Sequence, residues 1–354
     1  MIIRKSVLGI VLCGLLSMNA FADGLALGNA ELENRIAALE SLVIQLQAQI
    51  DSNANKLQHV SVTDGDLNGV AGPHFIIEGA NVHVRSGAGS TGEGCNAFNA
   101  INCVTRTGLG NLIIGYNEPR PLGWDPTGLC ASDADAQDDF GRSICTRREG
   151  AHHLVVGMRN NFVGHGGAVL GLLNEVKGSH ATVTGGRENA AARYASVSGG
   201  VRNVASSSLS SVSGGWGNRA DGAASSVAGG EFNVASGYSS SVSAGQQNIA
   251  SGPFSAVSGG NFNTAGGEAA TVGGGNGNSA GGPWSTVSGG EANQANNFGS
   301  VVSGGRANAS QGEISAVSGG FNNVAWGRST SISGVVNKQA HAEGCTVGDN
   351  GVDC

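Results

Sequence analysis

The sequence predicts a mainly β protein, a parallel β-roll or solenoid of 14–15-residue coils, with a short N-terminal α-helical coiled coil. Three observations predict it: a core valine recurs every 14 or 15 residues, an asparagine and a small residue recur in the same phase, and an apolar heptad precedes them. The composition agrees, because 61 of the 354 residues are Gly and only 13% are charged. Such a chain is organised by repeated turns more readily than by one large globular core.

Residues 1–22 have the pattern of a signal peptide. Arg4 and Lys5 precede an apolar run over residues 7–16, and Ala20 and Ala22 flank Phe21 as a small-x-small cleavage site. We therefore expect cleavage after Ala22 and a secreted protein, either extracellular or held at the cell surface.

Residues 23–58 are predicted to form a coiled-coil stalk. Apolar residues alternate at spacings of three and four, which is the seam of a coiled coil and predicts a homo-oligomer. The heptads alone leave dimer against trimer open. The predicted seam consists of Leu32, Ile36, Leu39, Val43, Leu46, Ile50, Asn53 and Leu57.

Residues 59–118 form a predicted β transition or base, and residues 119–150 an irregular, disulfide-stapled insertion. Short alternating runs at 75–77 and 82–84 are typical of strands, and 111–117 looks like an early coil. Six cysteines remain after residue 22, and an even number in a secreted chain predicts disulfides. The simplest connectivity is Cys95–Cys103, Cys130–Cys145 and Cys345–Cys354. Zinc is the alternative, but no Cys-x-x-Cys pair occurs.

Residues 151–337 carry the repeat S-V-S-G-G-x-x-N-x-A-x-G-x-x-S, and residues 338–354 a C-terminal cap. The predicted core row is Val155, Val169, Val183, Val197, Val212, Val227, Val242, Val257, Val272, Val287, Val302, Val317 and Ile332. The predicted asparagine ladder is Asn160, Asn174, Asn189, Asn203, Asn218, Asn233, Asn248, Asn263, Asn278, Asn293, Asn308, Asn323 and Asn337.

A coil of this length has room for two short strands and two turns. We expect the valine of one strand and the alanine of the other to point inward, the Gly-Gly pair to supply a positive-φ turn, and each asparagine to stack on the next. One valine and one alanine per coil bury little apolar surface against the ordering cost. This thin core favours several rods packed side by side, held in register by the stalk.

Two stretches, His153-Leu154-Val155-Val156-Gly157 and Thr182-Val183-Thr184-Gly185-Gly186, are each followed after two residues by an asparagine of the ladder. They resemble the head repeats of trimeric autotransporter adhesins, the YadA-like head. The resemblance covers about 110–345 and implies three β-rolls around a threefold axis, joined to coiled-coil stalks. Asn53 is similar to the polar core positions of those stalks, which favours a trimer. The sequence departs from the family in placing the coiled coil first and in ending without the family's C-terminal membrane anchor.

Candidate chemical sites are few. His152, His165 and His180 precede core valines and could stack as metal ligands, although polar turn residues are the simpler interpretation. Calcium is a candidate cofactor for an acidic loop, and a solvated loop without an ion is the simpler alternative. Its candidate ligands are Asp133, Asp135, Asp138 and Asp139. No catalytic constellation stands out from the repeat, so we expect no enzyme, and the net charge of −7 argues against nucleic acid as a partner.

Exposed aromatic residues beside the turns are candidates for docking a glycan or a host receptor, although they form no clean row and scattered turn packing is the simpler interpretation. They are Trp216, Phe232, Phe254, Phe262, Trp284, Phe298, Phe321 and Trp326. The leading hypothesis is an extracellular structural or adhesive protein, a trimeric rod-shaped head that binds a surface or builds a surface fibre. The alternatives are a soluble solenoid that binds calcium or ice, and a subunit of an end-to-end extracellular filament.

Overall fold

The computed structural model describes residues 29–65, 72–85, 109, 111–115, 148, 150–349 and 351–353. The chain divides into two compact units, Met1–His83 and Val84–Cys354. The boundary falls inside the predicted transition 59–118, which is therefore shared between the two units. Within the described residues, no helix combines the length and the apolar character that crossing a membrane requires.

The first unit contains one described helix and a two-stranded antiparallel sheet. Helix α2 (Asn29–Lys56) has Glu31 in its first turn and Lys56 in its last, so both charges oppose the helix macrodipole. Strands β1 (Val60–Thr63) and β2 (His74–Ile77) follow it and pair from Val60 with Ile77. The helix confirms the predicted helical segment, but it ends two residues before position 58.

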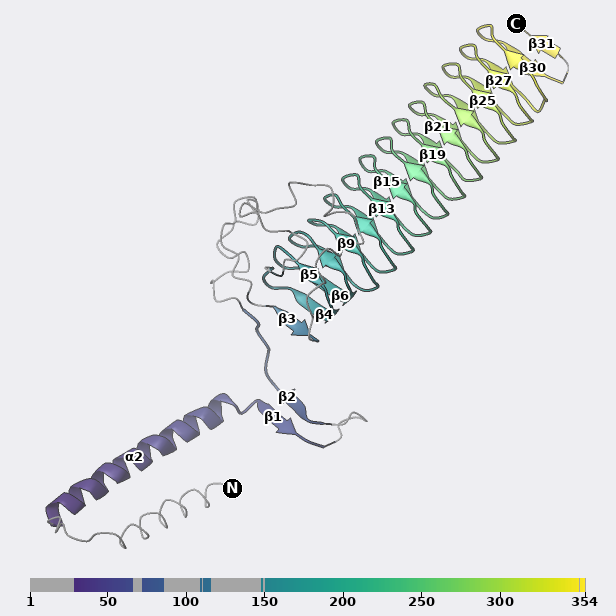
Figure 1. Cartoon of the computed structure of the whole chain (residues 1–354). Helices are drawn as coiled ribbons and strands as arrows, with labels where there is room; N and C mark the ends of the chain where they lie inside the picture. The colour runs from purple at the N-terminus through teal and green to yellow at the C-terminus, as the bar shows by residue number, and fades with distance from the viewer. Residues whose placement is uncertain are drawn as a thin grey trace. The chain divides into compact units, whose positions relative to one another are not determined.

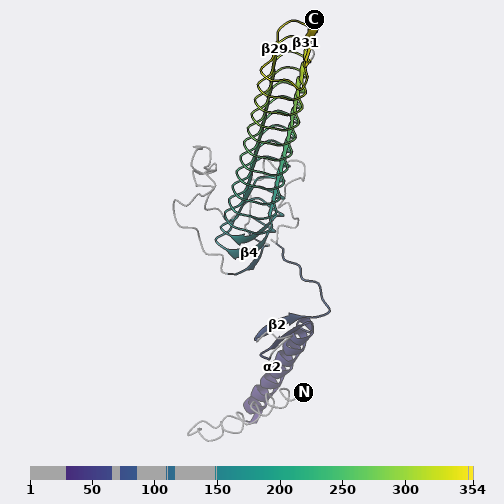
Figure 2. The ribbon, with the colours of Figure 1, turned by 90° about the vertical axis from the view of Figure 1, so that its right-hand side faces the viewer.

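The second unit is a parallel β-solenoid of about 13 coils, as the sequence predicts (Figure 1). Each coil contributes one strand to each of two parallel sheets, and Figure 2 shows the coils stacked along one axis. The first sheet, which we call the valine sheet, comprises β3 (Leu112–Ile114), β4 (Leu154–Met158), β6 (Ala168–Leu172), β8 (Thr182–Val183), β10 (Ser196–Val197), β12 (Ser211–Val212), β14 (Ser226–Val227), β16 (Ser241–Val242), β18 (Ala256–Val257), β20 (Thr271–Val272), β22 (Thr286–Val287), β24 (Val301–Val302), β26 (Ala316–Val317), β28 (Ser331–Ile332), β30 (Thr346–Gly348) and β31 (Gly351–Asp353).

The second sheet, the alanine sheet, faces the first across the thin interior. It comprises β5 (Asn161–Phe162), β7 (Glu175–Val176), β9 (Ala190–Ala191), β11 (Val204–Ala205), β13 (Arg219–Ala220), β15 (Val234–Ala235), β17 (Ile249–Ala250), β19 (Thr264–Ala265), β21 (Ser279–Ala280), β23 (Gln294–Ala295), β25 (Ala309–Ser310), β27 (Val324–Ala325) and β29 (Gln339–Ala340).

The register keeps equivalent repeat positions in contact. Val197 pairs with Val212 in the valine sheet, and Ala205 pairs with Ala220 in the alanine sheet. Successive coils are therefore about 4.8 Å apart, the usual spacing of hydrogen-bonded strands.

The solenoid is longer than the predicted range 151–337. At its start, β3 pairs in parallel with β4, so residues 112–114 belong to the first coil. At its end, β29 and β30 continue the two sheets past residue 337. Only β31 departs from the parallel pattern, because it turns back antiparallel on β30 and covers the edge of the valine sheet. The predicted cap 338–354 is therefore mostly solenoid.

The interior is as thin as the repeat predicts. Every residue of the predicted core row, from Val155 to Ile332, has at most 1% of its surface exposed. Alanines such as Ala220 and Ala250 face them from the other sheet with no exposed surface.

Each regular coil places at least three residues at positive φ. One is the second glycine of the Gly-Gly pair, for example Gly215 at φ 90°. A Cβ there would overlap the carbonyl oxygen of Gly230 in the next coil, so only glycine fits. Two further positions lie immediately before the ladder asparagine and three residues before the core valine. They hold residues as bulky as Phe262 and Phe254, at φ 57° and 58°.

Candidate functional site

The asparagine ladder runs through the interior of the solenoid at the first turn of each coil. Asn218 is fully buried, and its backbone N–H donates to Oδ1 of Asn203 at 2.9 Å. Its Nδ2 donates to the carbonyl oxygens of Gly214, in its own coil, and Gly230, in the next, at 2.9 and 2.8 Å. Each side chain therefore joins neighbouring coils and satisfies backbone groups that a buried turn would otherwise leave unpaired. The ladder therefore has a structural role, because its buried side-chain amides are occupied by hydrogen bonds to the backbone.

Asn337 does not belong to this ladder, contrary to the prediction. The ladder position of that coil is Lys338, whose backbone N–H donates to Oδ1 of Asn323 at 3.0 Å. Asn337 lies one residue earlier, exposed and at φ 55°, and accepts a hydrogen bond from Nδ2 of Asn322 at 2.9 Å. The reason is the coil length. Asparagine follows the core valine by five residues in the first coils but by six in the regular ones. In the coil of Ile332, the residue that contacts the ladder is the sixth, Lys338, and not the fifth, Asn337.

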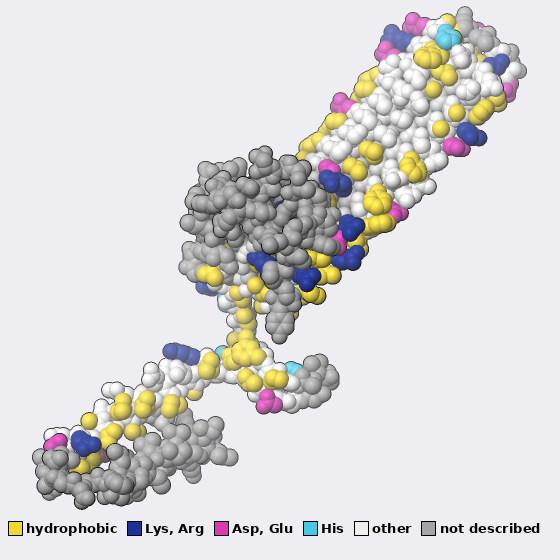
Figure 3. Space-filling view, viewed as in Figure 1, with side chains coloured by type: hydrophobic (Ala, Val, Ile, Leu, Met, Phe, Trp, Pro, Cys, Tyr) yellow, Lys and Arg dark blue, Asp and Glu magenta, His cyan; other side chains and the backbone are white. Residues whose placement is uncertain are grey.

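The exterior of the solenoid offers four surfaces: the outer faces of the two sheets and the two turn edges. We call the residues four and five after each core valine the first-turn edge. The residues four and three before each core valine form the second-turn edge. Most of the solenoid surface visible in Figure 3 is uncharged, and its charged side chains occur singly or in small groups.

The first-turn edge mixes charged, polar and aromatic side chains, several of which contact one another. Nε of Arg202 lies 2.6 Å from Oε2 of Glu188. Nε2 of Gln246 donates to Oε2 of Glu231 at 3.0 Å. The rings of Trp216 and Phe232 on successive coils have centroids 4.7 Å apart. Of the predicted aromatic residues, Phe262 and Phe321 also lie on this edge.

The second-turn edge is apolar over eight successive coils. Between Ser208 and Ile314, it carries two carboxylates, Glu268 and Glu313, and no basic side chain. Its large apolar side chains are about half to two-thirds exposed: Leu209 67%, Tyr238 55%, Phe254 56%, Trp284 60%, Phe298 47% and Ile314 53%.

Trp326, the last of the predicted aromatic residues, lies on neither edge. It belongs to the outer flank of the alanine sheet, where its ring stacks on His341 with centroids 6.0 Å apart. The structure thus divides the eight aromatic residues among three surfaces.

The outer face of the valine sheet carries small, uncharged side chains. The residues on either side of each core valine, from Ser196 to Ser333, are Ser, Thr, Ala or Gly with one exception, Val301. Side chains this small leave the sheet surface open to close approach by another surface.

The predicted coiled-coil seam is exposed along α2. Its leucine and isoleucine side chains from Leu32 to Ile50 are between 42% and 50% exposed, Val43 is half-buried and Asn53 is exposed. Leu57 follows the last helical residue, Lys56, so this predicted seam residue lies outside α2. These side chains form an exposed apolar stripe on the helix, the pattern that is typical of contact surfaces.

Two of the three candidate histidines, His165 and His180, belong to a stack of rings on successive coils, and His152 is not part of that stack. His165 and His180 have centroids 5.1 Å apart, and His180 stacks on Tyr194 at 5.3 Å. Nδ1 of His165 also hydrogen-bonds with Oγ of Ser179 at 3.0 Å. In the part of the chain that the structure describes, no three His, Cys, Asp or Glu side chains converge to hold a metal ion. The acidic cluster of Asp133, Asp135, Asp138 and Asp139 lies outside that part, so the calcium site stays a prediction.

Cys345 is buried at the last coil and is disulfide-bonded. Its predicted partner and the other two predicted disulfides lie outside the described residues, so the connectivity also stays a prediction. The residues concerned are Cys95, Cys103, Cys130, Cys145 and Cys354.

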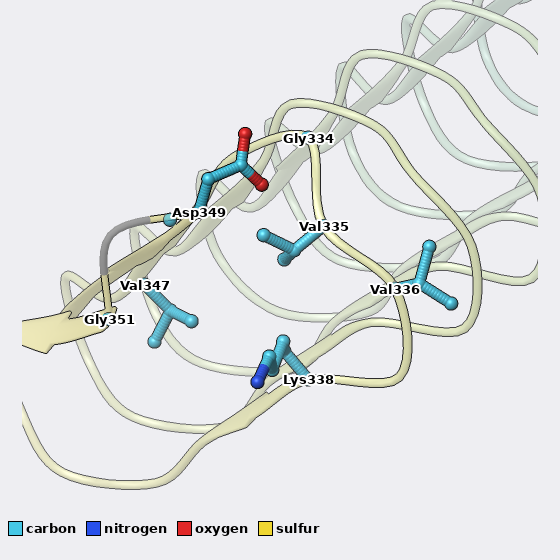
Figure 4. A pocket seen from close by; sticks show the side chains of 8 residues that line it. Gly334, Val335, Val336, Lys338, Val347, Asp349 and Gly351 are labelled. Atoms are coloured by element: carbon cyan, nitrogen blue, oxygen red, sulfur yellow. The ribbon is translucent and has the colours of Figure 1, made fainter.

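A hollow of about 280 Å³ opens at the C-terminal end of the solenoid. Val335, Val347, Lys338 and Asp349 are among its lining residues (Figure 4). The hollow lies beside the last coil, where the stack of coils ends. It combines valine side chains with one basic and one acidic side chain.

Comparison of the chain with protein-family models finds no match, and comparison with curated protein sequences finds none either. The candidate function therefore rests on the surfaces themselves. The sequence pattern could not separate the two edges, because the aromatic residues occupy repeat positions that look irregular along the chain.

Proposed function

We propose that the protein is an extracellular structural or adhesive protein, a homotrimer whose solenoids form a head similar to the YadA-like adhesin heads. The observation that carries the proposal is the apolar seam of α2, left exposed along nearly four heptads in the single chain. Covering these side chains favours association, because burial of apolar surface is the main favourable term in most protein association. The polar seam residue Asn53 favours a defined number of strands.

The solenoid supports the same proposal from its own surface. Its core of one valine and one alanine per coil gains little from burial, so contact with a neighbouring solenoid would add stability that each protomer lacks. The uncharged outer face of the valine sheet suits such contact, since small side chains allow close approach without burying charge. The signal-peptide pattern of residues 1–22 supports an extracellular location.

Analytical ultracentrifugation of the full mature chain tests the proposal. We expect a mass of three protomers for the wild type and of one for Ile36→Glu, which places a charge in the seam. Ile44→Glu is the matched control, because Ile44 is 70% exposed and lies outside the seam. A monomeric wild type, or an equal loss of mass in both variants, would contradict the trimer.

A second candidate function is an end-to-end filament subunit. The observation that favours it is the tip of the solenoid, where β31 covers the valine sheet but β29 remains the edge strand of the alanine sheet. An uncovered edge strand is a template for pairing with another chain. Negative-stain images of the secreted protein would support this function if they showed filaments that repeat at the protomer length, and discrete particles at all concentrations would refute it.

A further inference from the structure

We propose that the second-turn edge binds a neutral, linear polysaccharide along the length of the solenoid. The inference deepens the proposed adhesive function and rests on it, because it names the class of partner. The site consists of the exposed side chains Leu209, Tyr238, Phe254, Trp284, Phe298 and Ile314.

This edge holds bulky residues at a position that the fold keeps in the left-handed region in every regular coil, whatever the residue type. Leu209, Phe254, Trp284 and Ile314 occupy the left-handed position three residues before the core valine, with φ between 54° and 61°. Other coils fill the same position with Gly299 or Gly344, which adopt it without steric cost. A bulky side chain in this conformation destabilises the fold. Because the side chain is exposed, it buries little apolar surface within the chain to offset that cost. Strained residues that the fold does not require are candidates for function.

The charge of the edge selects a neutral partner. Its carboxylates, Glu268 and Glu313, would repel acidic polymers, and the edge offers no basic group between Ser208 and Ile314 to attract them. Glu268 and the hydroxyl groups of Ser208 and Ser239 lie among the apolar side chains on the same edge. Such groups can exchange hydrogen bonds with sugar hydroxyls.

The geometry of the edge selects a linear partner. Successive coils offer positions about 4.8 Å apart, the strand spacing, which is close to the length of one sugar residue in an extended β-linked chain. Aromatic rings present electron-rich faces, against which the C–H groups of a sugar ring can pack. Tyr238 and Phe254 lie on successive coils with their rings edge to face, 5.4 Å apart between centroids, and Trp284 and Phe298 also lie on successive coils, so the edge offers two pairs of neighbouring apolar contacts.

The shape of the edge disfavours a globular protein as the occupant. Binding hot spots between proteins cluster at the centre of an interface, where surrounding contacts exclude water. Here, the apolar side chains follow a narrow row of turns with alanine, serine and glycine between them. A row of this kind suits a chain that lies along it.

The test uses the full mature chain and measures its retention on cellulose and chitin particles, with heparin beads as the acidic comparison. We expect retention on at least one neutral polysaccharide and none on heparin. The double variant Phe254→Gly, Trp284→Gly should lower the affinity for the retaining polysaccharide at least tenfold. Its melting temperature should not fall, because glycine occupies the same position in other coils.

Phe262→Gly is the matched control on the opposite edge. Phe262 is 56% exposed, as Phe254 is, and also has a positive φ, and glycine fills its position at Gly217 and Gly277. The affinity of Phe262→Gly for the retaining polysaccharide should stay within twofold of the wild-type value. Equal losses in the two variants, or no retention of the wild type on either neutral polysaccharide, would overturn the assignment.

Sedimentation of every variant separates this inference from the proposed trimer. A smaller assembly for Phe254→Gly, Trp284→Gly would show that the edge joins copies of the chain, and that result would also overturn the inference. A monomeric wild type that still binds polysaccharide, and loses binding only in the double variant, would refute the trimer and support the site.

Discussion

Removal of one ladder asparagine should destabilise the solenoid far more than its single side chain suggests. In Asn293→Ala, the molecule loses two hydrogen bonds from Nδ2, to the carbonyl oxygens of Gly289 and Gly305, both at 2.9 Å. It also loses the bond that Oδ1 accepts from the backbone N–H of Asn308 at 3.0 Å. These three bonds differ in what their loss leaves behind.

The amide of Asn308 dominates the cost. Asn308 is fully buried, so its N–H would lack a partner out of reach of water, which costs about 1–3 kcal/mol. Gly305 keeps the hydrogen bond that its carbonyl oxygen accepts from the N–H of Glu291, and Gly289 is only partly buried. With about 1 kcal/mol for the net loss of the donated bonds, we expect Asn293→Ala to lower the free energy of unfolding by about 2–4 kcal/mol.

Denaturant unfolding at fixed protein concentration, followed by circular dichroism, measures this loss, because an oligomer's stability depends on concentration. Hydrogen exchange should localise it to coils next to residue 293, since repeat proteins couple mainly to nearest neighbours. Asn337→Ala is the control: its side chain is exposed and outside the ladder, so the change should stay below about 1 kcal/mol. Equal losses in the two variants would refute the reasoning.

Two further pairs of variants test the coil itself by the same unfolding measurement. Gly215→Ala should cost more than about 3 kcal/mol or prevent folding, because its φ is positive and its Cβ would overlap the carbonyl oxygen of Gly230, whereas nothing lies near a Cβ on Gly214, where alanine should cost less than about 0.5 kcal/mol. Val302→Ala should cost about 2–3 kcal/mol because Val302 is fully buried, while Val301→Ala, on the half-buried outer face, should cost less than half as much. Equal effects within either pair would contradict the inward and outward assignments.

The interior of the solenoid could be predicted from the sequence almost completely. Every coil needs a buried side chain on each strand and a turn whose backbone groups are hydrogen-bonded. The same residue types therefore recur at the same repeat positions, and this periodicity can be read from the sequence. The prediction was wrong at Asn337. In that coil, Val335 replaces the second glycine of the Gly-Gly pair, and the only asparagine lies five residues after the core residue rather than six. Only the contact of Lys338 with Asn323 identifies the ladder position of that coil.

The exterior depended on the tertiary structure. Along the chain, Tyr238 and Phe254 occupy different repeat positions and look scattered, but one turn brings both positions to the same edge. The left-handed conformations at Phe254 and Trp284 likewise have no signal in their residue types, because bulky side chains normally avoid that region. The sequence by itself therefore determined the repeat and its core, since burial demands the same residue types in every coil. Stacking of the coils decided which exposed side chains lie in line, because the surface makes no such demand on the sequence.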